Sequence, residues 1–257
     1  MAIPLVFDPE ARYVTSYLLK PATLGSTRLS LGIHALVTNL VILIWSGVAS
    51  DQSGTYFSYF THLSYIGVTA WFWASGVQTF AFARNRKNED DARYPLQSWP
   101  KPLQILHELL FSTIATFPFV VTIVYWALLA SSDSFSSPYL AWSNISQHIL
   151  NSVFVLFELV FTDLPTLPWI YLPATIVLLG LYLGVAYITS STQGFYAYTF
   201  LDPKKQGALL AGYIIGIAVG QAILFIIVHY AILLRIRLVG SKHRAPQHNH
   251  DEEKTVP

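Results

Sequence analysis

The chain has 257 residues, of which 53% are hydrophobic and only 11% are charged, with a net charge of +1 and a mean hydropathy of +0.47. Soluble domains carry about 25% charged residues, so this composition predicts an integral membrane protein. The near-neutral charge gives no indication of a nucleic-acid partner, and the absence of cysteine excludes disulfides, thiol catalysis and thiolate metal sites.

Apolar runs separated by clusters of charge define the predicted membrane spans. A helix needs about 20 apolar residues to cross the hydrocarbon core, and six segments reach or approach that length. The fourth is the weakest because it begins with the polar sequence NISQHILN, and the prolines of TDLPTLP separate it from the fifth. The six predicted spans are residues 29–48, 57–82, 105–130, 144–162, 169–190 and 208–234.

We therefore predict an all-α fold, a bundle of six transmembrane helices over residues 29–235, in a plasma membrane or an endomembrane. Residues 1–28 lack the apolar core of a signal peptide, and the polar tail 236–257 is expected to be disordered. Of the 15 Lys and Arg residues, 13 fall in residues 1–28, 83–104 or 235–257, all on one side of a six-span bundle. The positive-inside rule then places both termini in the cytosol.

Polar side chains recur on one face of two predicted spans. Residues with such spacing share a helical face, and inside a membrane they normally form interhelical hydrogen bonds or mark a functional site. The fourth span carries Asn144, His148, Asn151, Glu158 and Thr162 at spacings of 4, 3, 7 and 4. The second carries Ser58, Thr61, His62, Tyr65 and Thr69 on a similar face.

Thr61 and His148 are the candidate catalytic residues. Both spans are entered from the outer side, and at 1.5 Å per residue both side chains lie roughly 6–8 Å below the start of their helices. A hydroxyl and an imidazole that meet form a nucleophile and a general base, suited to attack on a lipid ester just below the headgroups. The residues predicted to orient this pair or to stabilise an oxyanion are Asn144, Tyr65 and Asn151.

Other histidines and carboxylates leave alternatives open. His62 points about 100° away from Thr61 on a helix, so we expect a structural role for it rather than that of the base. A second polar set toward the cytosolic side needs partners inside the bundle, and the expected pair there is Glu158 with His34. Two histidines are expected toward each side of the membrane, His34 with His229 and His62 with His148, which would also fit two haem groups with two histidine ligands each. The sequence has no compact metal motif, however, so we predict neither metal nor cofactor. This second set comprises His34, Glu108, Glu158 and His229.

Three stretches, YFTHLSYIG, NISQHILNSVFVLFE and STQGFYAYTFLDP, resemble the androgen-induced-protein family, to which rolling-stone-like proteins are similar. The resemblance covers about residues 29–235. It implies a multi-pass membrane hydrolase of fatty acid esters of hydroxy fatty acids, with Thr61 as nucleophile and His148 as base. The chain departs from the family's enzymes in having Ile145 where they carry a second histidine.

These observations predict a lipid-ester hydrolase whose partners are its lipid substrate and membrane lipids. The similarity to rolling-stone-like proteins implies the main alternative, a non-catalytic membrane receptor, scaffold or fusion factor.

Overall fold

The computed structural model describes residues 7–50, 53–86 and 93–243, and in this part of the chain all regular secondary structure is helical, without a strand. The long uninterrupted helices are α1 (Pro21–Ser50), α2 (Phe60–Asn85), α7 (Tyr171–Gln193) and α9 (Leu209–His243). Two further membrane-length segments are each built from several shorter helices. The first consists of α3 (Lys101–Ile114), α4 (Phe117–Val124) and η4 (Tyr125–Leu129). The second consists of α5 (Pro138–Ile145), η6 (Ser146–Leu150) and α6 (Asn151–Phe161). The short elements are η1 (Arg12–Val14), η2 (Ser53–Ser58), η3 (Pro95–Ser98), η5 (Ser132–Phe135), η7 (Thr199–Leu201) and α8 (Pro203–Gln206).

Five helical segments in the described residues are long and apolar enough to cross a membrane, which supports the expected integral membrane class. They correspond to the first, third, fourth, fifth and sixth predicted spans. The helix over the first predicted span begins at Pro21 and the one over the fourth predicted span begins at Pro138, so both start earlier than the sequence pattern indicated. These segments are Pro21–Ala49, Lys101–Leu129, Pro138–Phe161, Tyr171–Gln193 and Leu209–Gly240.

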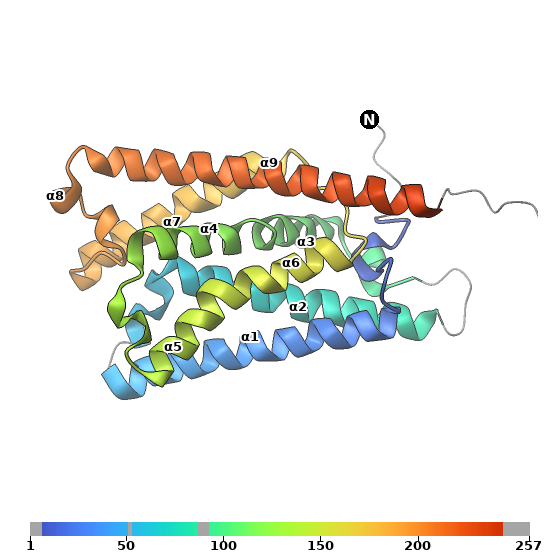
Figure 1. Cartoon of the computed structure of the whole chain (residues 1–257), viewed down its shortest axis with the longest axis horizontal. Helices are drawn as coiled ribbons and strands as arrows, with labels where there is room; N and C mark the ends of the chain where they lie inside the picture. The colour runs from blue at the N-terminus through green and yellow to red at the C-terminus, as the bar shows by residue number, and fades with distance from the viewer. Residues whose placement is uncertain (1–6, 51–52, 87–92, 244–257) are drawn as a thin grey trace, which may run out of the picture.

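Helix α2 forms over the second predicted span but is less apolar than those five segments. It carries several polar side chains, and these are buried against other parts of the bundle. Ser75, Gln78 and Thr79 are all buried. The helix lies alongside α1, and successive long segments run in alternate directions, so that α1 begins and α9 ends at the same end of the bundle (Figure 1). Close approach of α1 and α2 requires glycine, since a Cβ added to Gly76 would come within 2.7 Å of the Leu29 side chain.

The third predicted span is not a continuous helix. It breaks between α3 and α4, where Pro118 lacks the N–H that would bond to the carbonyl of the preceding turn. Thr116 sits at this break, and its hydroxyl accepts a hydrogen bond of 2.9 Å from Gln221 of α9. Both interrupted segments also contain a π-turn, η4 and η6, which sequence periodicity did not indicate.

The strongest polar contact in the interior joins Arg28 of α1 to Glu158 of α6. Arg28 Nε donates to Glu158 Oε1 at 2.8 Å and Nη2 donates to Oε2 at 2.7 Å, with both side chains 0% exposed. Arg28 Nη1 also donates to the Tyr13 carbonyl and to the Thr79 hydroxyl, each at 2.7 Å. The pair therefore connects α1, α2, α6 and the N-terminal segment.

This contact corrects the expected pairing of Glu158 with His34. His34 packs its ring edge-on against Phe154, and its Nε2 is buried without a hydrogen-bond partner. Arg28 was assigned to the segment before the first span, but α1 begins at Pro21 and brings its guanidinium inside the bundle. A carboxylate prefers this partner because the planar guanidinium donates two parallel hydrogen bonds.

Replacing Glu158 with Gln should reduce the free energy of unfolding by about 3–5 kcal/mol, because it leaves the Arg28 charge buried and uncompensated. Denaturation of the purified protein in detergent measures this loss. The matched control is Glu10→Gln, which removes an ion pair of 2.6 Å to Arg12 in an exposed setting and should cost less than about 1 kcal/mol. Equal losses in the two variants would contradict the structural importance of the buried pair.

Candidate functional site

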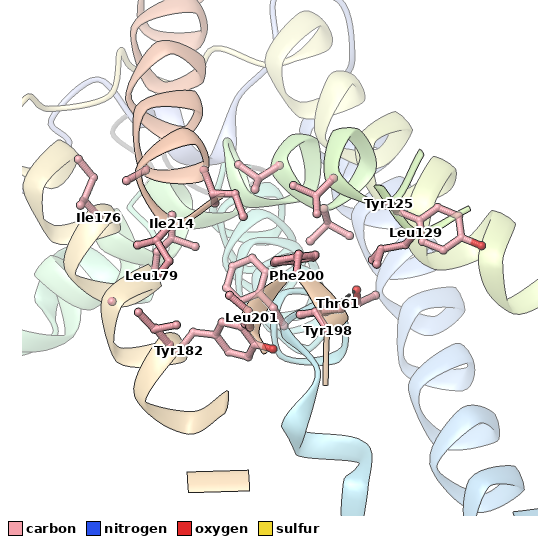
Figure 2. Close-up of a pocket in the computed structure, with 18 residues that line it drawn as sticks. Thr61, Tyr125, Leu129, Ile176, Leu179, Tyr182, Tyr198, Phe200, Leu201 and Ile214 are labelled. Atoms are coloured by element: carbon pink, nitrogen blue, oxygen red, sulfur yellow. Dashed lines mark hydrogen bonds between the residues drawn. The ribbon is translucent and has the colours of Figure 1, made fainter. Parts of the chain in front are cut away.

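A cavity of about 230 Å³ lies between α2, the α4–η4 segment, α7, α9 and the loop that contains η7 (Figure 2). Its walls are valine, leucine, isoleucine, alanine, glycine and aromatic side chains. The polar atoms among the lining side chains are hydroxyls, and no charged side chain lines the cavity in the described part of the chain. The hydroxyl-bearing residues are Thr61, Tyr125, Tyr182 and Tyr198.

Thr61 lies in the first turn of α2 and is 8% exposed. The residue before the helix, Tyr59, makes no side-chain cap, so the amides of this turn keep the partial positive charge of a helix N-terminus. The Thr61 amide donates to the Tyr198 hydroxyl at 3.3 Å, and the two hydroxyl oxygens are 3.4 Å apart. Figure 2 shows both residues at the same wall of the cavity.

Tyr198 is the functional candidate that sequence reasoning missed. The loop after α7 positions it, starting where Gly194 ends the helix with a positive φ of 80°. Its ring stacks on Phe200 at 5.1 Å, and burial raises the pKa of its phenol, so the hydroxyl stays protonated and can donate. The available signal was the uncharged aromatic sequence GFYAYTF, whose polar atoms need buried partners.

His148 lies in the π-turn η6 and is 6% exposed. Its ring stacks on Tyr125 with centroids 3.6 Å apart and planes 4° apart, and its Nδ1 is buried without a hydrogen-bond partner. Tyr125 also lines the cavity that contains Thr61, and α2 packs against η6. The structure thus brings Thr61 and His148 to the same end of the bundle, but no hydrogen bond joins them among the described residues.

None of the three predicted supporting residues forms a side-chain hydrogen bond with Thr61 or His148. Asn144 donates to the Ser134 carbonyl at 2.9 Å, and Asn151 donates to the Pro118 carbonyl at 3.2 Å. Tyr65 is buried but does not line the cavity. The expectation assumed regular α-helix from Asn144 onward, whereas the π-turn η6 changes the angular position of side chains before and after it.

His62 forms contacts with the residues that precede α2. Its Nδ1 lies 2.7 Å from the Tyr56 carbonyl, which can only accept, so this nitrogen donates. Its ring stacks on Tyr56 with centroids 4.1 Å apart. These contacts connect the start of α2 to η2 and hold the turn on which Thr61 lies.

The second polar set does not form a cluster. Glu108 accepts a hydrogen bond of 2.7 Å from the Tyr171 hydroxyl, and His229 Nδ1 donates to the Leu167 carbonyl at 2.8 Å. Glu158 and His34 have the separate environments described above, and no hydrogen bond, ion pair or ring contact within the described ranges joins any two of the four. Within the same ranges there is no group of three or more His, Asp or Glu side chains placed to hold a metal ion.

Fold and site together define a class of protein: an all-helical chain with span-length apolar helices and a hydroxyl-lined apolar cavity at one end of the bundle. Comparisons with protein-family models, curated protein sequences and solved structures find no match.

Two substitutions of His148 should separate its packing from its polarity. His148→Ala should reduce the free energy of unfolding by about 2–4 kcal/mol, because it leaves a void against Tyr125. His148→Phe keeps a stacked ring and removes an unpaired buried nitrogen, so its stability should stay within about 1 kcal/mol of the original. Detergent-solubilised thermal unfolding measures both, and a His148→Phe variant as unstable as His148→Ala would show that the ring nitrogens have structural partners.

Proposed function

We propose that this chain is an integral membrane lipid-ester hydrolase with Thr61 as nucleophile and His148 as general base. The observation that carries the proposal is the position of the Thr61 hydroxyl, at the wall of an apolar cavity and beside the Tyr198 hydroxyl. Such a site suits a substrate with a hydrocarbon chain and one reactive polar group.

In this proposal α2 also crosses the membrane, as the second of six spans, and both termini are cytosolic. Its 26 residues are long enough for a span, and its buried polar side chains avoid contact with lipid. The first and last helices meet the same end of the bundle, which agrees with the basic residues concentrated in the terminal segments and the 83–104 loop (Figure 1). Thr61 then lies near the outer surface of the membrane.

The proposed reaction begins with the acyl chain in the cavity and the ester carbonyl beside Thr61 Oγ1. This oxygen attacks the carbonyl carbon, and its proton passes to His148. The carbonyl oxygen becomes an oxyanion, to which the Tyr198 hydroxyl and the amides of the first turn of α2 donate. When the ester C–O bond breaks, His148 returns the proton to the departing alcohol, and water then hydrolyses the acyl-threonine with His148 again as base.

Two features make His148 suitable as the base although it is not bonded to Thr61. Its buried Nδ1 has no existing hydrogen bond that would have to break before it accepts a proton. Catalytic hydrogen bonds are often long or poorly aligned until substrate is bound. The resemblance to the androgen-induced-protein family selects the same two residues and suggests fatty acid esters of hydroxy fatty acids as the substrates.

Replacing Thr61 with Ala or His148 with Phe should lower kcat for such an ester by roughly 100-fold or more. The assay follows hydrolysis by protein purified in detergent, and mass spectrometry of the intact chain detects the acyl adduct, which should disappear in Thr61→Ala. Thr192→Ala, at an exposed hydroxyl on α7, is the control and should retain full activity. Unchanged turnover in Thr61→Ala would exclude the mechanism. If the original chain shows neither hydrolysis nor an acyl adduct, the receptor or scaffold alternative is favoured.

Tyr198→Phe tests the proposed oxyanion donor. The substitution keeps the ring that stacks on Phe200 but removes the hydroxyl. Loss of one oxyanion donor should lower kcat roughly 100-fold with little change in KM, because the interaction forms in the transition state. Steady-state kinetics over a range of ester concentrations measures both constants, and an increase in KM alone would assign Tyr198 to substrate binding.

A further inference from the structure

A second apolar depression shares a wall with the Thr61 cavity. It is a groove of about 290 Å³ lined by residues of α2, of the α3–α4 break and of α7. Phe60 and Tyr182 line both the cavity and the groove, and therefore separate them. The groove's other walls include Gly67, Ile114, Phe117, Leu178, Leu181 and Val185.

The two shared residues are held in different ways. Tyr182 is anchored, because its hydroxyl donates to the Ser58 carbonyl at 3.0 Å. Phe60 is partly exposed and makes ring contacts, with its centroid 5.0 Å from Tyr182 and 5.2 Å from Phe117. A change in the Phe60 rotamer would open the wall without breaking a side-chain hydrogen bond. Phe60 also immediately precedes Thr61, so the opening would lie beside the reactive hydroxyl.

The groove faces the hydrocarbon in the proposed membrane orientation. Leu181 on its rim is 63% exposed, and no charged side chain lines the groove within the described ranges. The groove lies on α7, one of the helices apolar enough to span the membrane. These walls favour an apolar occupant, and the wall shared with the Thr61 cavity indicates that the occupant belongs to the same molecule that reacts there.

We propose that Phe60 and Tyr182 form a lateral gate through which substrate reaches Thr61 from within the bilayer, and that the groove holds a second hydrocarbon chain of that substrate. This inference rests on the proposed function. The acyl chain occupies the Thr61 cavity, the chain of the alcohol component lies in the groove, and the ester group crosses the gate. Esters with two long chains are thus preferred over soluble esters with one short chain.

The test compares two substrates, the palmitate ester of a hydroxystearic acid and para-nitrophenyl butyrate. Leu178→Trp fills the groove, and the matched control Val177→Trp places the same bulk on the adjacent residue, which is 60% exposed and lines neither depression. In Leu178→Trp the ratio of kcat/KM for the long ester to that for the short ester should fall roughly tenfold or more, because several methylenes lose their burial. Val177→Trp should leave the ratio unchanged.

Val185→Trp repeats the measurement at another wall of the groove, in case Leu178→Trp does not fold. A non-hydrolysable ether analogue with a diazirine in the alcohol-derived chain gives a readout independent of turnover, and should crosslink to residues 178–185 of the original chain. Unchanged ratios in both groove variants, equal effects in the control, or crosslinks elsewhere would overturn the gate. Absence of Thr61-dependent hydrolysis of either ester would instead overturn the proposed function, and the gate with it.

Discussion

The buried ion pair between Arg28 and Glu158 is the constraint on which the arrangement of the bundle depends. Two charges in an apolar interior are tolerable only when each satisfies the other and the remaining donors find acceptors. Arg28 meets this condition by bonding also to the Tyr13 carbonyl and the Thr79 hydroxyl. The requirement fixes α1, α2 and α6 relative to one another. Because α6 continues directly from η6, the pair also helps to fix the position of the π-turn that carries His148 against α2.

Irregularities in the helices are concentrated where the candidate site forms. An interrupted helix leaves backbone groups unpaired, and in an apolar bundle other side chains must bond to them or hold the break in place. Gln221 of α9 donates to the hydroxyl of Thr116 at the α3–α4 break, while Asn151 and Ser152 of α6 both donate to the Pro118 carbonyl. These contacts hold α4, α6 and α9 together beneath the cavity. Several polar residues that resemble catalytic groups in the sequence are therefore used for packing.

What distinguishes Thr61 from these structural polar residues is its access to a cavity. Thr79 and Thr162, for example, bond within the packed interior, whereas Thr61 lies between an uncapped helix start, a protonated phenol and an apolar space. In the proposed membrane orientation, the adjoining groove faces the hydrocarbon. A site so placed suits a molecule that stays in the bilayer while one polar group reacts at its edge, as the proposed hydrolysis requires.

The sequence alone determined the helical class and five segments long and apolar enough to cross a membrane, because the length of an apolar run is a local property. It also indicated Thr61 and His148, and the structure places them at one end of the bundle. Only the tertiary structure decided the partner of Glu158, which lies 130 residues away, the π-turn at His148 and the approach of Tyr198 to Thr61 across 137 residues. These features depend on how helices pack, and a short polar stripe does not specify which of many distant groups will face it.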